Sequence, residues 1–346
     1  GVIEGFYDRL WTWDERERFA QAVGALGFTH YVWAPKEDRL QNAGWRTPYP
    51  DDERRRLAAF AEARRRNGMS PWFGLRPVGF SYADDADAER VVEKLRDHVE
   101  LGAAGILLLA DDIPASLDAA AAGRFADLAG AHAWLVGRVA RALGAAPLAF
   151  CPTEYHGSGG TYLHRLGAAV PLEVDLCWTG PEVCSPAISA DEARGIGTVL
   201  GRRPLIWDNY PVNDAAMTGE LHIGPIRDRD VGLAELTAGI WVNPAMEPEA
   251  SLVPMATWAD YLDGPSAYDP DTSWARALRR IAGSAADAGA VAALAAHADR
   301  SVIRQPWRRP AGASVDPAAY RAASVANDRL ATDLRRFVDA LPAQDG

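Results

Sequence analysis

Two adjacent aspartates, Asp111 and Asp112, follow a run of apolar residues at 106–110. Such a pair can perform acid–base chemistry, because one carboxyl group can carry a proton while the other accepts a hydrogen bond. Two nearby anions also push their pKa values apart, which would keep one aspartate protonated near neutral pH. The simplest alternative is a pair that caps the N-terminus of the next helix.

The spacing of this pair indicates how it could act on a glycosidic bond. Neighbouring strand residues point to opposite faces, so the two carboxylates could diverge around a sugar. A nucleophile and an acid of the usual retaining kind lie about 5 Å apart across the scissile bond, which neighbours on one strand achieve poorly. The pair is better suited to two different roles. One aspartate would protonate the leaving oxygen, and the other would hold an attacking substrate group such as a 2-acetamido group.

The rest of the sequence predicts the scaffold that positions the pair. Short runs rich in Val, Ile, Leu and aromatic residues alternate with amphipathic stretches, at about 1–6, 29–35, 70–76, 105–110, 147–152, 173–178, 204–208 and 238–243. Eight strands alternating with helices predict an α/β fold, the (β/α)8 TIM barrel. Thr12 and Glu15 form a capping box before the first helix. We expect the barrel at 1–265, then a linker and a small C-terminal helical appendage at 266–346.

Polar residues follow seven of the eight expected strands. They lie at 5–7, 35–38, 111–112, 151–155, 178–180, 207–209 with Asn213 and Asp214, and Asn243. A lone Asp or Asn after a strand is often only a turn residue or a helix cap. The C-terminal ends of the strands form the active-site face of a TIM barrel, so seven such ends together favour a functional site.

Composition excludes several other classes of protein. The formal net charge of −11 argues against binding to nucleic acid or to an anionic membrane surface. No apolar run reaches the roughly 18 to 20 residues of a membrane span, and the first residues do not resemble a signal peptide. We expect a soluble protein, cytoplasmic or secreted depending on segments outside this sequence. The scarcity of Lys against Arg suggests a bacterial source with GC-rich DNA.

Metal and nucleotide chemistry are not indicated either. The seven histidines show no metal-ligand spacing, which argues against a catalytic metal. Neither a glycine-rich phosphate loop nor a nucleophile elbow occurs in the right context. Three cysteines, an odd number, do not form a disulfide framework, so we expect Cys151, Cys177 and Cys184 to be reduced.

The strand-end blocks resemble those of glycoside hydrolase family 84, the O-GlcNAcases and bacterial β-N-acetylglucosaminidases once named hyaluronidases. Seven blocks in the same order carry this resemblance: 1–7, 31–36, 111–113, 151–155, 178–181, 207–209 with Asn213 and Asp214, and 243–244. The match spans about residues 1–260. It implies hydrolysis of terminal β-linked N-acetylglucosamine, on a glycan or a glycoprotein, without metal or cofactor.

The resemblance also implies a role for each matching residue. Asp111 would orient the acetamido group, whose carbonyl oxygen attacks C1 to form an oxazoline. Asp112 would act first as the general acid and then as the general base. The implied substrate contacts are Gly5, Lys36 and Asn243 with hydroxyls, Asp214 with the 4- and 6-hydroxyls, Asn209 with the acetamido end, Tyr155 with the oxazoline, and Cys151, Thr179, Val183 and Trp207 around the acetyl methyl.

Two positions depart from the family pattern. Asp8 stands where the first block usually continues with Gly, and Ala215 stands where an aromatic residue often follows the aspartate. These departures leave open a non-catalytic barrel that binds N-acetylglucosamine. An endo-acting enzyme of the hyaluronidase type is a further alternative, although Asp214 would enclose the non-reducing end of the substrate and so favours exo-action.

Overall fold

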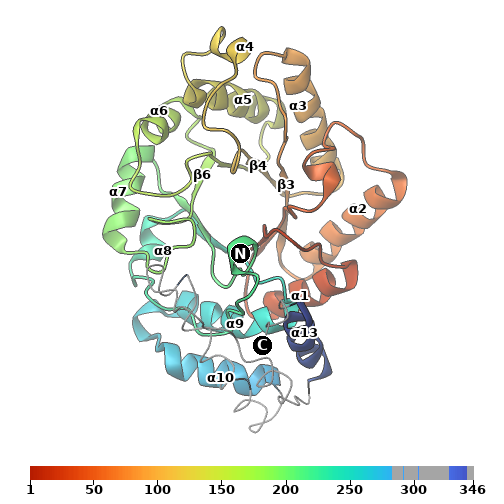
Figure 1. Ribbon diagram of the computed structural model, residues 1–346, viewed down its shortest axis with the longest axis vertical. Coiled ribbons are helices and arrows are strands. Elements are labelled where there is room, and N and C mark those ends of the chain that lie inside the picture. The colour runs from red at the N-terminus through yellow and green to blue at the C-terminus, as the bar shows by residue number, and fades with distance from the viewer. Residues whose placement is uncertain (283–290, 292–302, 304–326, 341–346) are drawn as a thin grey trace, which may run out of the picture.

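The computed structural model describes residues 1–282, 291, 303 and 327–340. Within these residues, eight parallel strands pair in chain order, and β8 returns to β1 to close a barrel (Figure 1). The strands are β1 (Val2–Glu4), β2 (His30–Trp33), β3 (Ser70–Leu75), β4 (Gly105–Leu109), β5 (Leu148–Cys151), β6 (Asp175–Trp178), β7 (Leu205–Asp208) and β8 (Gly239–Val242). The eight strands and the TIM barrel predicted from the sequence are confirmed.

Helices surround the strands and begin where the sequence supplies caps. The α-helices are α1 (Trp13–Ala25), α2 (Asp51–Arg66), α3 (Asp85–Glu100), α4 (Ala119–Ala122), α5 (Leu128–Leu143), α6 (Thr161–Ala169), α7 (Ala190–Leu200), α8 (Leu233–Leu236), α9 (Pro248–Asp263), α10 (Pro270–Ala282) and α13 (Asp328–Ala340). Short 3₁₀ turns lie at η1 (Arg39–Gln41), η2 (Ala215–Met217) and η3 (Pro265–Ala267). The capping box of Thr12 and Glu15 is present at α1, as predicted.

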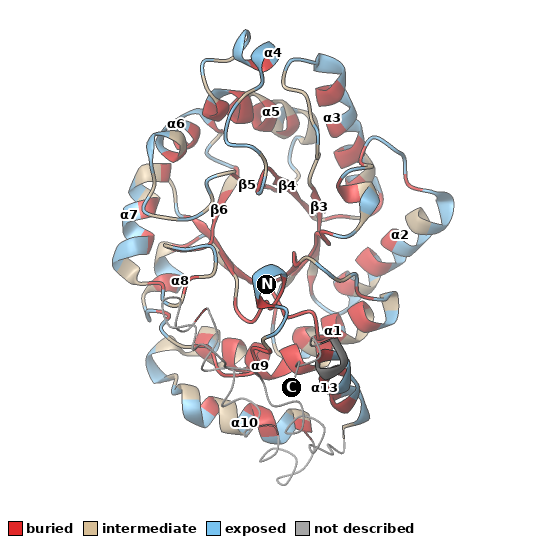
Figure 2. Ribbon diagram, in the orientation of Figure 1, coloured by how far each residue is buried: buried red, intermediate tan, exposed pale blue. Residues whose placement is uncertain are grey.

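The core has two layers because each strand is covered on both faces. Side chains such as Leu107, Ala149 and Trp241 fill the barrel interior. Those of Ile106, Leu108 and other outward-facing residues pack against the surrounding helices. Figure 2 shows the buried residues on the helix sides that face the strands. A strand buried on both faces needs a continuous apolar sequence, which explains the run Gly105–Leu109.

Helices α10 and α13 pack on the outer side of α9 (Figure 1). Their contact is a cluster apart from the barrel core, formed by residues such as Val253, Leu278 and Leu334. Part of the helical appendage expected within 266–346 is thus present as α10 and α13, while most of 283–326 lies outside the described residues. The division of the chain at residue 265 remains a prediction.

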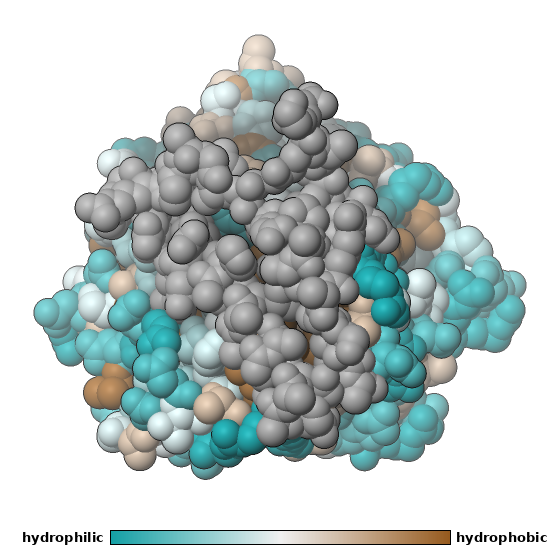
Figure 3. All heavy atoms as spheres, turned by 60° about the horizontal axis from the view of Figure 1, so that its bottom comes forward, coloured by the Kyte–Doolittle hydropathy of each residue, from teal (hydrophilic) through white to brown (hydrophobic). Residues whose placement is uncertain are grey.

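The described surface in Figure 3 is largely hydrophilic, with hydrophobic residues scattered singly. Large apolar side chains that are exposed include Leu10, Leu172 and Val231. Scattered exposure of this kind is normal for a protein surface. Among the described helices, none combines the length and the apolar character needed to cross a bilayer.

Candidate active site

Strand alternation places Asp111 at the mouth of the barrel interior. Leu107 and Leu109 of β4 belong to the interior layer, and Asp111 lies two residues beyond Leu109 on the same face. Lys36, which follows β2, forms a buried ion pair with Asp111 through Nζ and Oδ2. Asp111 Oδ1 is also buried, but no hydrogen-bond partner for it exists in the part of the chain that the structure describes. One oxygen of this carboxylate is therefore left to accept a hydrogen bond from a ligand.

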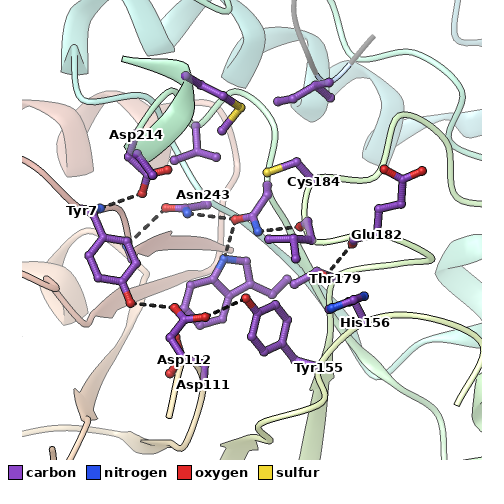
Figure 4. Close-up of a pocket in the computed structure, with 18 of the residues that line it drawn as sticks. Tyr7, Asp111, Asp112, Tyr155, His156, Thr179, Glu182, Cys184, Asp214 and Asn243 are labelled. Carbon is purple, nitrogen blue, oxygen red and sulfur yellow. Dashed lines mark hydrogen bonds between the residues drawn. The ribbon is translucent and has the colours of Figure 1, made fainter. Parts of the chain in front are cut away.

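Asp112 shares the cavity of Asp111, contrary to the opposite faces expected of strand neighbours. Its backbone has φ +53°, a left-handed conformation that turns the chain after β4. Aspartate tolerates this conformation better than most residues. The hydroxyl of Tyr7 donates to Asp112 Oδ2 at 2.6 Å, and that of Tyr155 donates to Oδ1 at 2.9 Å (Figure 4). Two tyrosines thus hold the carboxylate over the cavity.

Asp112 does not have the raised pKa that mutual repulsion of the two aspartates would give it. Burial by itself raises the pKa of Asp112. The hydroxyl of Tyr7, the charge of Lys36 and the hydroxyl of Tyr155 act against burial, and together they hold the pKa below its ordinary value. The physical reason is that Lys36 neutralises Asp111, while the tyrosines stabilise the ionised form of Asp112.

Three polar side chains at the ends of β7 and β8 form a hydrogen-bonded chain. Asn209 Oδ1 accepts from Trp207 Nε1 and from Asn243 Nδ2, both at 3.0 Å. Asn243 Oδ1 in turn accepts from the backbone N–H of Gly5 at 3.2 Å. A Cβ at Gly5 would stand 2.4 Å from the indole of Trp207, so only glycine permits this close approach. These hydrogen bonds set the orientation of the amide groups of Asn209 and Asn243, which face the cavity.

Four residues of the cavity lining, Cys151, Thr179, Val183 and Trp207, are mostly apolar. Cys151, Thr179 and Trp207 are almost fully buried, whereas Val183 is 42% exposed. Asn209 Nδ2 donates to the carbonyl oxygen of Val183 at 2.8 Å, which ties that residue to the end of β7. The chemistry of these side chains suits a methyl group better than a charged group. All three cysteines are free, as expected, with Cys151 and Cys177 buried and Cys184 half-buried.

The opposite side of the cavity is formed by loops after β1 and β7. Asp214 Oδ2 accepts from the backbone N–H of Tyr7 at 2.7 Å, and Asp8 Oδ2 accepts from that of Ala215 at 2.7 Å. Asp8 and Ala215 have φ +66° and φ +51°. The two positions that depart from the family pattern therefore contact each other. Burial raises the pKa of Asp214, the N–H of Tyr7 lowers it, and the charge of Asp8 raises it again.

A single cavity of about 630 Å³ brings together all twelve residues that the sequence singled out. They are Gly5, Lys36, Asp111, Asp112, Cys151, Tyr155, Thr179, Val183, Trp207, Asn209, Asp214 and Asn243. The cavity also contains residues to which the sequence assigned no role, including Tyr7, His156, Glu182 and Cys184 (Figure 4). Tyr7 ends the first strand-end block, and His156 directly follows the block at 151–155. Glu182 and Cys184 lie in a loop without a local signal.

The described residues hold no group of three or more His, Cys, Asp or Glu side chains arranged to bind a metal ion. The cavity instead offers one ion-paired aspartate, a second aspartate held by hydroxyls, and the mostly apolar side chains of Cys151, Thr179, Val183 and Trp207. Residues 1–296 match the family model of β-N-acetylglucosaminidases. The chain belongs to this family.

Solved and curated relatives agree with this assignment. The structure of a mutant O-GlcNAc hydrolase from Thermobaculum terrenum is 33% identical with a TM-score of 0.85, covering 90% of this chain and 68% of that one. The structure of CpGH84B is 27% identical with a TM-score of 0.76, covering 85% and 53%. The Protein O-GlcNAcase of Rattus norvegicus is 29% identical over 270 residues, 75% of this chain. The match spans only 29% of that relative's length.

Proposed function

We propose that this β-N-acetylglucosaminidase family member is a retaining, exo-acting glycosidase that releases terminal β-linked N-acetylglucosamine by substrate-assisted catalysis. The observation that carries the proposal is the buried, unpartnered Oδ1 of Asp111, which lines the same cavity as Cys151, Thr179, Val183 and Trp207. A buried acceptor without a donor is costly unless a ligand supplies one. The N–H of an acetamido group would satisfy Asp111 while its methyl packs against those four residues.

In this arrangement the substrate supplies the nucleophile. Asp111, held by Lys36, orients the acetamido group and favours attack of its carbonyl oxygen on C1. The C1–aglycone bond breaks and an oxazoline forms. Asp112 gives its proton to the departing oxygen, and then takes a proton from the water that opens the ring. The first product keeps the β-configuration because C1 is inverted twice.

Asp112 must carry a proton when the glycosidic bond breaks, although its pKa lies below the ordinary value. The hydroxyls of Tyr7 and Tyr155 contribute to that low pKa by donating to the carboxylate. A sugar that takes over these hydroxyls as partners would remove this stabilisation and raise the pKa of Asp112. Tyr155 would then be free to donate to the developing oxazoline.

The far side of the cavity supports exo-action. Asp214, reached from the end of β7, would accept from the 4- and 6-hydroxyls of the sugar, and Lys36 and Asn243 would bind other hydroxyls. An acceptor for the 4-hydroxyl favours a terminal residue, which has that hydroxyl free. O-GlcNAc proteins are one substrate class suggested by the relatives' names, and terminal glycan residues are another.

The test is turnover of aryl 2-acetamido-2-deoxy-β-glucosides, with an N-trifluoroacetyl analogue alongside. Fluorination weakens the internal nucleophile, so the rate should fall. Asp112→Ala should cost about 10²- to 10⁴-fold on a poor leaving group and far less on an activated one. Asp191→Ala, at an exposed position on α7, is the matched control.

Two outcomes would contradict the proposal. Binding of N-acetylglucosamine without any turnover would identify a non-catalytic barrel. Equal rates on the N-acetyl and the N-trifluoroacetyl substrate would exclude the acetamido group as nucleophile.

A further inference from the structure

A second cavity, of about 440 Å³, lies between the loops that follow β3 and β4. Asp112 lines both this cavity and the one described above, so it stands at their junction. Leu108, Leu135 and Phe150 also line the second cavity. The two cavities therefore share the proposed general acid as a lining residue.

The walls of the second cavity are mostly apolar. They are formed by side chains from the two loops, namely Val78, Phe80, Tyr82, Ile113, Pro114 and Leu117. The rings of Phe80 and Tyr82 meet edge to face, with 4.8 Å between their centroids. Apolar and aromatic walls of this kind suit the face of a ring better than a hydrated chain.

Arg76 supplies the positive charge of this cavity. It follows β3 directly, and its guanidinium lies 5.7 Å from the centroid of the Tyr7 ring. Its Nε is buried without a hydrogen-bond partner anywhere in the described residues. The buried Arg16 and Arg229 each donate twice to a carboxylate, of Glu4 and of Asp208, whereas the buried Arg64 also has an Nε and an Nη1 without partners among the described residues. An arginine whose buried donor lacks a partner is suited to an anionic ligand.

We propose that the second cavity is an aglycone subsite, in which Arg76 binds a carboxylate on a ring-sized leaving group that packs against the apolar walls. This inference rests on the proposed function, because the aglycone must lie next to the acid that protonates the glycosidic oxygen. The planar guanidinium fork matches a carboxylate, and the volume of about 440 Å³ leaves room for a ring. The natural substrates would then join N-acetylglucosamine to an acidic ring.

The experiment compares two substrates whose leaving groups differ mainly in charge, the 3-carboxyphenyl and 3-carbamoylphenyl β-N-acetylglucosaminides. The wild type should prefer the carboxylate by about ten- to hundredfold in kcat/KM, the range of a hydrogen bond to a charged group. Arg76→Gln should bring the ratio close to one. Any effect of Arg76 on the acidity of Asp112 is shared by both substrates and cancels in the ratio. Arg96→Gln, on the exposed side of α3, should keep the wild-type ratio.

A measurement on the wild type alone covers the case in which Arg76→Gln does not fold. Added salt should reduce the carboxylate preference and leave the neutral substrate unaffected. A wild-type ratio of kcat/KM near one, or a ratio that is unchanged in Arg76→Gln, would contradict the proposed subsite but not the proposed glycosidase activity. No turnover of either substrate overturns the proposed function as well. A preference seen only with serine-linked N-acetylglucosamine in acidic peptides would replace the ring with a peptide side chain.

Discussion

Asp111, Cys151 and Trp207 lie on or directly after barrel strands, whereas Asp8, Asp214 and Ala215 lie in loops that cross the top of the barrel. We call these the strand group and the loop group. The strand group faces the interior because side chains alternate along β4, β5 and β7. The loop group depends on left-handed turns and on hydrogen bonds between residues 207 positions apart. The barrel frame thus positions the proposed chemistry, while loop contacts shape the recognition of hydroxyls.

Among the variants that compare the two groups, Asp111→Asn should show the largest effect, because it acts on the strand group at the proposed reacting centre. We expect kcat to fall by about 10²- to 10³-fold, as when a preorganised electrostatic contact is lost. The loss should be the same for good and poor leaving groups, because the nucleophile is disturbed rather than the acid. Steady-state kinetics on an aryl series measures it, with Asp191→Asn as control. Nearly normal rates would remove Asp111 from the mechanism.

Glu247→Gln tests a buried residue whose hydrogen bonds hold the loop group in place. Glu247 Oε2 accepts from Asn213 Nδ2, and Asn213 Oδ1 accepts from the N–H of Met246, which braces the loop that carries Asp214. Burial raises the pKa of Glu247 to about 7, although the bond from Asn213 lowers it and the charge of Asp333 raises it. Between its ordinary pKa of 4.5 and about 7, the folded chain keeps a proton that the unfolded chain has released.

The stabilisation linked to that proton is therefore complete below pH 4.5 and lost as the pH rises through about 7. A neutral glutamine avoids burying the charge, so Glu247→Gln should raise the free energy of unfolding at pH 8 by about 1–3 kcal/mol. Near pH 4 the gain should vanish. Urea denaturation at both pH values measures it, and an equal change at both would show that the charge of Glu247 is not the cause.

Asp8 provides a smaller test within the loop group. Asp8→Gly relieves the left-handed backbone but removes the acceptor for the N–H of Ala215. We expect KM to rise about two- to tenfold, the value of one net hydrogen bond, with kcat little changed. Asp8→Asn keeps an acceptor and removes the charge that raises the pKa of Asp214. It should move the acidic limb of kcat/KM to lower pH. An unchanged KM in the glycine variant would show that the hydrogen bond between Ala215 and Asp8 does not shape the site.

Tyr7→Phe should have the smallest effect. Tyr7 links the aspartate pair after β4 to the loop group, because its hydroxyl donates to Asp112 and its backbone N–H donates to Asp214. Removing the hydroxyl takes away a bond that lowers the pKa of Asp112. The basic limb of kcat/KM, where the acid loses its proton, should move to higher pH. A pH profile of both enzymes measures this. A shift to lower pH would contradict the role of Tyr7 in setting the acidity of Asp112.

Most of the barrel could be predicted from the sequence because each strand carries its own apolar signal. The run Gly105–Leu109 is long and uninterrupted, and the capping box of Thr12 and Glu15 marks a helix start without reference to the rest of the chain. The site could be predicted as far as it follows strand ends. Glu182 and Cys184 were missed, because nothing in the local pattern shows that a loop residue will lie against a cavity.

The barrel, its strands and the set of polar residues at their C-terminal ends could be predicted without coordinates, because they depend on periodicity and spacing. The electrostatics of the aspartate pair depends instead on contacts that form only when the chain is folded. Lys36 reaches Asp111 from another strand, and Tyr7 and Tyr155 meet on Asp112 from two more. Those contacts reversed the expected rise in acid pKa, because a pKa depends on neighbours in space, which a linear pattern does not contain.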